Sequence, residues 1–369
     1  MLRAFGSPNL YIQGPGALTG LADVVRGFGK RAFAVIDPVV AELIGDKLKT
    51  QLEGLGDDFH LVEFGGECTA EEISRLSEAC RARNPDVVVG IGGGKAIDTA
   101  KGVRIEVERP LIIIPTIASN DSPTSRICVV YTADHALSEV RKMATNPDVV
   151  LVDTEVLVRA PARFFVAGVG DAVTKKFEAA QCWNEGGMNF YGYNPPYIAR
   201  QLADQCFETI VQEAEGALQA VERRSVNEAF ERTIEATILL SGLAFENGGL
   251  SIPHSLTRGL SSVPELACAL HGEQVAFGLI VQLVMEDRPE AELADISGFY
   301  QRIGLPRTLF ELGYSGDPEA ILETIARTTI EQAPYVRNFS KDVTMQSLQD
   351  ALRRTSTLIS GEGQVAKQE

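Results

Sequence analysis

Residues 86–101 read DVVVGIGGGKAIDTAK, a short apolar run that passes through three glycines into a helix-like segment. The run at 86–91 predicts a buried strand. Glycine lets backbone amides approach an anion closely, and a helix N-terminus adds partial positive charge. The stretch predicts a pyrophosphate-binding turn at Gly93, Gly94 and Lys95, with Asp98 on the helix that follows. The alternative is a plain Gly-rich connection, because the spacing differs from GxGxxG.

Similar apolar runs alternate with helix-like segments through the first part of the chain. These runs lie at 31–37, 59–64, 110–114 and 148–153. The alternation is typical of βαβ units in a mostly parallel sheet. Beyond about residue 160, apolar residues recur at helical spacing instead. We predict a Rossmann-like α/β domain over residues 1–160 and an all-helical domain over residues 161–369.

Composition narrows the class of partner. The chain has 369 residues, with 34 Lys and Arg against 50 Asp and Glu, so its formal net charge is −16. This charge repels nucleic acid phosphates and anionic membranes. No stretch resembles a secretory signal or a membrane span. The six scattered cysteines form no Cys-x-x-Cys pair, which favours reduced, buried thiols. We therefore expect a cytoplasmic protein with no nucleic acid or membrane partner.

Two further features suggest a nucleotide cofactor. Asp37 ends the apolar run at 31–36, where a carboxylate can accept the hydroxyls of a ribose and repel a 2′-phosphate. This favours NAD over NADP, although a strand-end Asp is also a common turn residue. The segment 115–125, PTIASNDSPTS, follows an apolar run and is rich in hydroxyl and amide groups, as a ligand-binding loop or a plain surface loop would be.

A candidate metal site lies in the helical part. The chain has only four histidines, and His254 and His271 both stand beside predicted helices. Asp171 lies in the segment VAGVGDAVTKKFEA, where we expect the first turn of a helix. Taken singly, each histidine is better explained as a core residue, and Asp171 as a helix cap. Together they form a three-ligand set that leaves positions open for water or substrate, as catalytic metal sites do.

Six motifs, taken in order along the chain, resemble those of a known protein family. They are IGGGKAIDTAKG, PTIASNDSPTS, NPDVVLVDT, GVGDAV followed by FEA, LLSGLAFENGGL and HGEQVAFG. From about residue 8 to 310 the chain is similar to the glycerol dehydrogenases of the metal-dependent, iron-type (group III) alcohol dehydrogenase superfamily. The resemblance implies the dehydroquinate synthase-like fold, NAD, zinc at Asp171, His254 and His271, and a homo-oligomer, often a ring-shaped octamer.

The resemblance also assigns roles to single residues. It implies that cofactor contacts fall on Asp37, Gly94, Lys95, Thr116, Ser119, Ser125, Ile127 and Tyr131. It implies that Asp121 contacts glycerol and that Phe245 forms an apolar wall of the site.

Lys175 and Lys176 together depart from the family pattern, in which Thr or Lys and then Trp precede FEA. Iron-dependent relatives carry a further His four residues after the metal-binding Asp, and this position is Lys175 here. Because a protonated Lys cannot ligate, zinc is favoured, while other divalent metals stay compatible with the ligand types. We expect the amines of Lys175 and Lys176 to reach solvent. The alternative is that Lys175 binds an anionic substrate group.

The resemblance favours NAD-dependent oxidation of glycerol or a related vicinal diol to the hydroxyketone, with a small polyol or hydroxy acid as substrate. The first alternative is a hydroxycarboxylate dehydrogenase that reduces 2-oxoacids, with Lys175 as its support. Glycerol-1-phosphate dehydrogenase and a dehydroquinate-synthase-like cyclase rank lower, the latter because its metal carboxylate is Glu and not Asp. A non-catalytic NAD-binding protein is also compatible with the fold.

Overall fold

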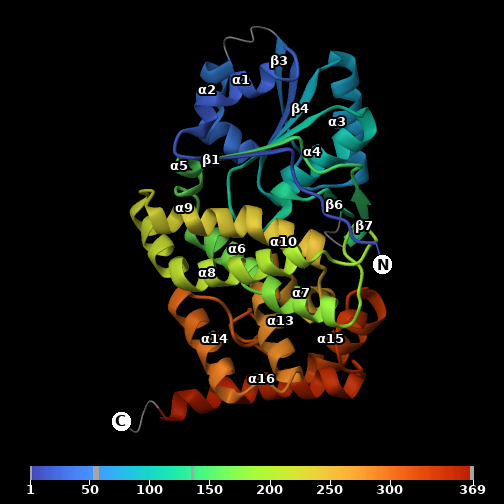
Figure 1. Ribbon diagram of the computed structural model, residues 1–369, viewed down its shortest axis with the longest axis vertical. Helices are drawn as coiled ribbons and strands as arrows, with labels where there is room; N and C mark the ends of the chain where they lie inside the picture. The colour runs from blue at the N-terminus through green and yellow to red at the C-terminus, as the bar shows by residue number, and fades with distance from the viewer. Residues whose placement is uncertain (1, 53–57, 134–136, 366–369) are drawn as a thin grey trace. The chain divides into compact units, whose positions relative to one another are not determined.

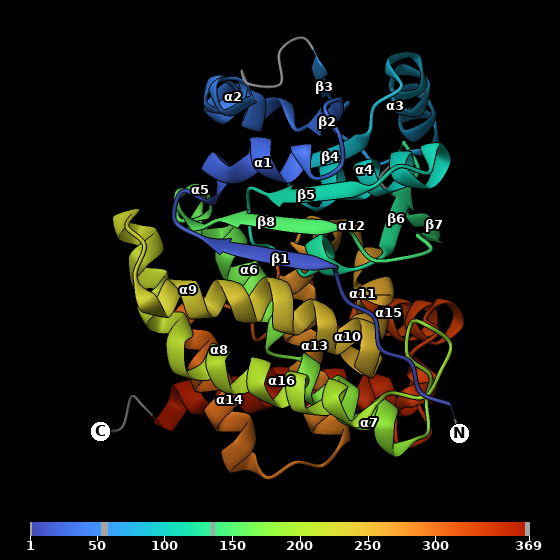
Figure 2. The same cartoon turned by 45° about the horizontal axis from the view of Figure 1, so that its top comes forward.

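The predicted strand at 86–91 is β4 (Val87–Gly92), an inner strand of a six-stranded, all-parallel sheet. Figure 2 shows the strand order β1-β8-β5-β4-β2-β3. Its other strands are β1 (Leu10–Gly14), β2 (Ala32–Ile36), β3 (Phe59–Glu63), β5 (Leu111–Pro115) and β8 (Val149–Asp153). The five strands predicted from the sequence are confirmed, and β1 was not predicted.

A computed structural model of the chain describes residues 2–52, 58–133 and 137–365. It divides into two compact units (Figure 1). The sheet unit comprises Gly6–Pro161 and Ala220–Gly242, and the helical unit comprises Met1–Phe5, Ala162–Gln219 and Leu243–Glu369. The division thus differs from a single boundary near residue 160, because a helical segment late in the chain belongs to the sheet unit.

The four inner strands, β8, β5, β4 and β2, are buried on both faces, which explains their continuous apolar runs. On one face Val87, Val89 and Ile91 join a core cluster with Leu21 and Val25 of α1. The other face meets α4 so closely that a Cβ at Gly90 would lie 2.6 Å from the Cβ of Ala100. The helices of this unit are α1 (Leu21–Arg26), α2 (Pro38–Leu52), α3 (Ala70–Arg83), α4 (Gly94–Val107), α5 (Thr154–Leu157) and α9 (Glu228–Ile234).

Three smaller elements of the sheet unit position polar groups. An antiparallel hairpin pairs β6 (Ile127–Tyr131) with β7 (Leu137–Lys142). The 3₁₀ turn η3 (Ser122–Thr124) precedes β6, and the π-helix η4 (Glu235–Leu240) continues α9. A second 3₁₀ turn, η1 (Ala17–Gly20), precedes α1. None of these four elements was predicted from the sequence.

In the helical unit, α16 packs against α13 and α15 (Figure 1). Its elements are α6 (Ala162–Ala172), α7 (Lys175–Asn184), α8 (Tyr197–Arg223), α10 (Ser241–Gly248), α11 (Ile252–Ser261), α12 (Pro264–Ala267), α13 (His271–Met285), α14 (Glu290–Ile303), α15 (Glu319–Gln332), η5 (Val336–Asn338) and α16 (Met345–Val365). The last residues of α8 and the first residues of α10 belong to the segment Ala220–Gly242 of the sheet unit. Within the described ranges, no helix has both the length and the apolar character needed to cross a membrane.

The cysteine prediction needs one correction. All six cysteines are free, and five are buried, but Cys268, which follows the short helix α12, is exposed.

Candidate functional site

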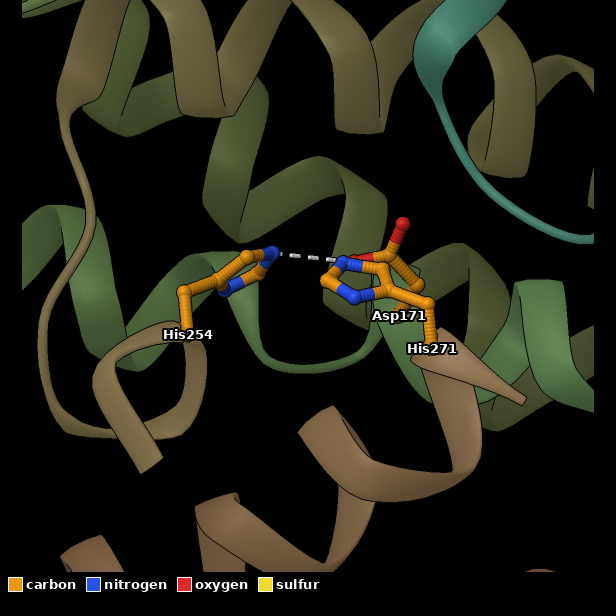
Figure 3. Close-up of side chains that lie close together, drawn as sticks. All are labelled: Asp171, His254 and His271. Atoms are coloured by element: carbon orange, nitrogen blue, oxygen red, sulfur yellow. Dashed lines mark ion pairs between the residues drawn. The ribbon is translucent and has the colours of Figure 1, made fainter. Parts of the chain in front are cut away.

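The three predicted metal ligands converge within the helical unit. Asp171 lies at the end of α6, His254 in the first turn of α11, and His271 at the first position of α13, and their side chains point toward one another (Figure 3). One ligand atom from each lies within 4.8 Å of those of the other two. Segments far apart in sequence therefore supply one carboxylate and two imidazoles to a single point.

Close helix contacts at glycines next to the ligands create this convergence. A Cβ added at Gly272 would lie 1.8 Å from the backbone oxygen of Ala167 in α6, and one at Gly170 would lie 2.6 Å from the oxygen of Gly272. Likewise, a Cβ at Gly278 of α13 would lie 2.7 Å from the Cα of Pro253 in α11. Helix backbones that approach this closely bring the neighbouring ligands within reach of one another.

The position of Asp171 corrects the expectation of an N-terminal helix turn. Asp171 is the second-last residue of α6, at the end where the helix dipole is negative and disfavours a carboxylate. It is therefore no N-terminal cap. Burial would raise the pKa of Asp171, but Lys175, His254 and His271 outweigh burial and hold that pKa well below its usual range.

The acceptor atoms of this cluster fit a cation. Asp171 Oδ1 lies 3.3 Å from His254 Nε2, and Asp171 Oδ2 is buried with no hydrogen-bond partner among the described residues. His271 has a ring that reaches solvent, yet desolvation lowers the pKa of His271 to about 4, so its imidazole is neutral at neutral pH and able to ligate. The residues present thus fit a three-ligand metal site.

Glu178 of α7 orients His254 and was not predicted from the sequence. Its Oε2 lies 2.7 Å from His254 Nδ1, while Oε1 accepts the backbone N–H of Ser251 at 2.9 Å. With Nδ1 facing this carboxylate, Nε2 is the ring nitrogen that faces Asp171. Burial would raise the pKa of Glu178, but His254 outweighs it and lowers that pKa. Carboxylates behind ligating histidines are typical of metal sites. The only signal in sequence is a Glu within the quoted FEA motif.

Lys175 does not reach solvent, which corrects the first expectation for its amine. Its side chain is fully buried, and its Nζ lies 2.5 Å from Asp171 Oδ1 and 3.3 Å from His254 Nε2. The turn at 173–174 separates α6 from α7, so Asp171 and Lys175 do not share one helix. Phe245, buried in α10, lies with its ring centroid 5.8 Å from Lys175 Nζ. Lys176, by contrast, is partly exposed.

In the sheet unit the glycine turn lies at the topological switch point. The chain moves outward from β2 to β3 and then returns to β4 on the other side of β2, so the carboxyl ends of β2 and β4 are neighbours. Open α/β sheets bind ligands at this point. Gly92 has φ of +149°, and a Cβ there would lie 3.1 Å from the Cβ of Asp37. Gly93 is the N-cap of α4, whose first N–H groups lack intrahelical acceptors.

Asp37 and Lys95 stand beside this turn with structural partners of their own. Asp37 Oδ1 accepts the N–H of Val39 at 2.9 Å, so the turn role considered above is present in the structure. Lys95, half exposed, forms an ion pair with Glu67 at 2.6 Å. A Cβ at Gly94 would lie 2.9 Å from Asn120 Nδ2. The glycine turn therefore directly contacts the segment 115–125, which we call the polar loop.

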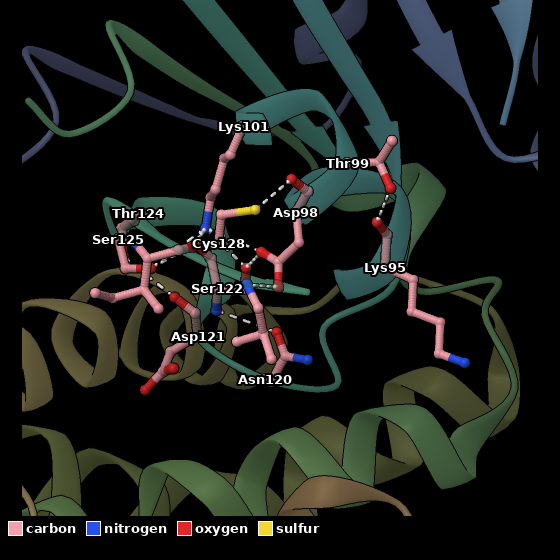
Figure 4. A network of polar contacts seen from close by, with 12 residues as sticks. Lys95, Asp98, Thr99, Lys101, Asn120, Asp121, Ser122, Thr124, Ser125 and Cys128 are labelled. Atoms are coloured by element: carbon pink, nitrogen blue, oxygen red, sulfur yellow. Dashed lines mark hydrogen bonds and ion pairs between the residues drawn. The ribbon is translucent and has the colours of Figure 1, made fainter. Parts of the chain in front are cut away.

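A buried network of hydrogen bonds supports the polar loop (Figure 4). Lys101 Nζ, fully buried, donates to the backbone oxygens of Ser122 and Ile127, each at 2.7 Å. Asp98 accepts Ser122 Oγ at 2.7 Å and the N–H of Val129 at 3.2 Å, and Ser125 Oγ lies 3.3 Å from Lys101 Nζ. Asp98 and Ser125 thus also support the loop, and their cofactor contacts stay predictions.

The other predicted cofactor residues have varied surroundings. Thr116 is buried, and its Oγ1 has no hydrogen-bond partner among the described residues, as expected of a group that awaits a ligand. Ser119 is half-buried in the same loop. Ile127 and Tyr131 open and close β6, with Ile127 buried and Tyr131 half-buried.

Asp121 is held by Ser241, the first residue of α10, directly after the π-helix η4. Its Oδ2 accepts the hydroxyl of Ser241 at 2.6 Å, and Thr124 Oγ1 lies 3.1 Å from the backbone oxygen of Ile238. A Cβ at Gly242 would lie 1.9 Å from Thr124 Oγ1, so only glycine allows this approach. Single π-turns often mark functional sites.

Comparisons with known proteins agree with this architecture. Residues 8–154 match the family described as iron-containing alcohol dehydrogenase. Glycerol dehydrogenase of Thermotoga maritima is 40% identical over 347 residues, which cover 94% of each chain. Glycolaldehyde reductase of Halobacterium salinarum is 38% identical over 95% of this chain and 96% of that protein. The crystal structure of glycerol dehydrogenase from Schizosaccharomyces pombe superposes with a TM-score of 0.93 at 32% identity, covering 99% of this chain and 93% of that one.

The fold and these relatives place the chain in one class, the oxidoreductases of the iron-type alcohol dehydrogenase fold. Within that class the chain belongs to the glycerol dehydrogenase family. The family and fold predicted from the six motifs are thereby confirmed.

Proposed function

We propose that this protein is an NAD-dependent polyol dehydrogenase that oxidises glycerol or a related small vicinal diol to the hydroxyketone. The observation that carries the proposal is the convergence of Asp171, His254 and His271, with one buried carboxylate oxygen lacking a partner, in a member of the glycerol dehydrogenase family. These three residues would hold one divalent metal, and we propose zinc. A divalent metal, when bound, supplies Lewis acidity that lowers the pKa of a hydroxyl group.

The protein's own groups position the reactants. Asp171, buried and kept ionised, supplies the negative charge of the metal site, while Glu178 fixes which nitrogen of His254 faces that site. Asp121, held by Ser241, would accept a hydrogen bond from a second substrate hydroxyl, which would select vicinal diols. Phe245 would supply apolar surface to the substrate site.

The glycine turn would hold the cofactor. The free N–H groups of α4 suit a pyrophosphate, Thr116 Oγ1 offers an unused hydrogen-bonding group, and Asp37 would repel a 2′-phosphate. NAD, when bound, supplies the hydride acceptor. A cytoplasmic location and a homo-oligomeric assembly, as an octamer or otherwise, stay predictions.

Reduction of a small hydroxyaldehyde is a second candidate. It is favoured by the similarity to a glycolaldehyde reductase at 38% identity. The hydroxycarboxylate alternative loses its main support, because the ammonium of Lys175 is engaged by Asp171.

A panel of substrates tests the proposal through NADH absorbance. Oxidation is measured with glycerol, 1,2-propanediol, 1-propanol and lactate, and reduction with dihydroxyacetone, glycolaldehyde and 2-oxobutyrate. We expect the two diols and dihydroxyacetone to react best, and 1-propanol poorly. Glycolaldehyde as the single good substrate would favour the second candidate. Turnover restricted to lactate and 2-oxobutyrate, or no turnover at all, would overturn both.

A further inference from the structure

The ammonium of Lys175 lies among the atoms that are expected to bind metal. Lys175 Nζ lies 2.5 Å from Asp171 Oδ1 and 3.3 Å from His254 Nε2, and its side chain is fully buried. These two acceptor atoms belong to two of the three convergent ligands. Zinc binds carboxylate oxygen and imidazole nitrogen at about 2.0–2.2 Å. A metal at that distance from both atoms would therefore compete with the ammonium for the same lone pairs.

Without a cation, this arrangement would be costly. Asp171 is a carboxylate with 1% of its surface exposed at the negative end of α6, and burying an unpaired charge is strongly unfavourable. Lys175 supplies one positive charge from the start of the next helix, so the Asp171 and His254 side chains keep their positions without a metal.

We infer that Lys175 is a built-in counter-ion of the metal site: it stabilises the metal-free form and must leave Asp171 when a divalent metal binds, which weakens metal affinity. The inference rests on the metal site of the proposed function. Two cations at contact distance from one carboxylate repel each other, so metal binding has to displace the ammonium. The ring of Phe245, 5.8 Å from Nζ, offers a cation–π surface for the displaced amine.

The neighbouring lysine provides a matched control. Lys176 has the same side chain one position later, but its Nζ lies over the ring of Phe207, 4.5 Å from the centroid, and no ion pair joins it to the ligand set. Lys175→Met and Lys176→Met remove the same charge from the same helix. They differ in whether that charge faces Asp171.

The test measures zinc binding with no substrate or cofactor present. Full-length protein and both variants are stripped with a chelator, zinc affinity is measured by competition with a chromophoric chelator, and the unfolding midpoint is recorded with and without zinc. We expect Lys175→Met to bind zinc at least about tenfold more tightly, which is about 1.4 kcal/mol. We also expect a lower midpoint without zinc and a larger rise on adding it, with Lys176→Met like wild type. Unchanged or weaker affinity in Lys175→Met overturns the inference.

A second variant covers loss of folding. Lys175→Gln also lacks the charge but keeps an N–H donor for Asp171, so it answers the same question if Lys175→Met does not fold without metal. Failure of the function and failure of the inference give different results. Tighter zinc binding by the variants without polyol turnover by wild type contradicts the function alone. Absence of zinc binding in wild type and in both Lys175 variants overturns the inference together with the metal site.

Discussion

At the scale of single residues, the predicted metal site depends on buried charged side chains and on the groups that pair with them. Glu178 is the clearest case, since it contacts both the ring and the backbone of His254. We predict that Glu178→Ala lowers zinc affinity about 10- to 100-fold, because His254 loses the group that orients it. Competition with a chromophoric chelator measures this loss. Glu265→Gln, on exposed α12, is the control. Equal affinities of Glu178→Ala and wild type would show that His254 needs no such support.

Asp121 belongs to the same scale through its bond to Ser241. Hydrogen bonds to charged groups contribute about 1.5–3 kcal/mol, so Asp121→Ala is expected to lower kcat/KM for glycerol about 10- to 100-fold. The activity on 1-propanol, which has no second hydroxyl, should change much less. Ser241→Ala should give a smaller loss in the same direction. Equal losses for both alcohols in Asp121→Ala would contradict the proposed contact with a second hydroxyl.

The sequence predicted which residues gather at the site, but it did not predict their burial or their hydrogen-bond partners. Asp171, His254 and His271 could be predicted because rare histidines and an Asp occur in recognisable motifs. The burial of Lys175 could not, because an amine near the start of a helix ordinarily reaches solvent, and the turn that brings it against Asp171 has no clear signal in the sequence. The support that Asp98 gives to the polar loop was also not predicted, since its partners lie in a loop that follows later in the chain.

At the scale of helices and strands, glycines set the distances between the ligands. Gly272 lies against the backbone of α6. Gly272→Ala should therefore lower the free energy of unfolding by about 3 kcal/mol, because a backbone atom cannot yield to a new methyl group. Its zinc affinity should fall as well, since His271 moves with α13. The control is Gly298→Ala in α14, where the nearest atom to a Cβ is the flexible Arg302 Nη1 at 3.4 Å. Chemical unfolding with and without zinc measures both effects, and a fully stable Gly272→Ala would contradict the packing argument.

The starts of β2 and β4 are joined by Asp86. This carboxylate accepts the N–H of Lys30 at 2.9 Å and the N–H of Arg31 at 3.0 Å, and it pairs with the guanidinium of Arg31. The Arg31 side chain, with the two backbone N–H groups, holds the pKa of Asp86 well below its usual range. A lowered folded-state pKa means that the stabilisation is present above the unfolded pKa of about 3.9 and is lost as pH falls through the folded value.

This linkage predicts a pH-dependent effect of Asp86→Asn. At pH 7 the variant should unfold at lower urea than wild type, because an amide is a weaker acceptor for these donors. The gap between the two midpoints should stay constant down to about pH 4 and narrow below it. Arg26→Gln, which breaks an exposed pair with Asp23, should show little effect at any pH. A gap that widens toward acid pH would contradict the sign.

Elements were predictable where burial was uniform. The strand at 148–153 was found from its continuous apolar run, since both of its faces are covered. The strand β1 was missed because it lies at the sheet edge and its residues are only half-buried or exposed. The break between α6 and α7 was also missed, because the sequence GDAVTKKF carries neither Pro nor a second Gly at the turn.

At the scale of the whole chain, the predicted cofactor site and the predicted metal site belong to different compact units. The sheet unit carries the glycine turn and Asp121, and the helical unit carries the three predicted metal ligands. The segment Ala220–Gly242 belongs to the sheet unit because its π-helical end bonds to the polar loop through Ser241 and Ile238. Helical periodicity alone could not reveal this, since a helix looks the same in either unit.

We propose that Asp171, His254 and His271 hold one divalent metal that polyol oxidation requires. The most direct measurement is NADH formation from NAD and glycerol by chelator-stripped protein during titration with zinc. We predict negligible activity without metal and a rise to a plateau at about one metal per chain. In His271→Ala the titration should stay flat. Full activity of the stripped protein, or a normal titration in His271→Ala, would contradict the proposed role of the metal site.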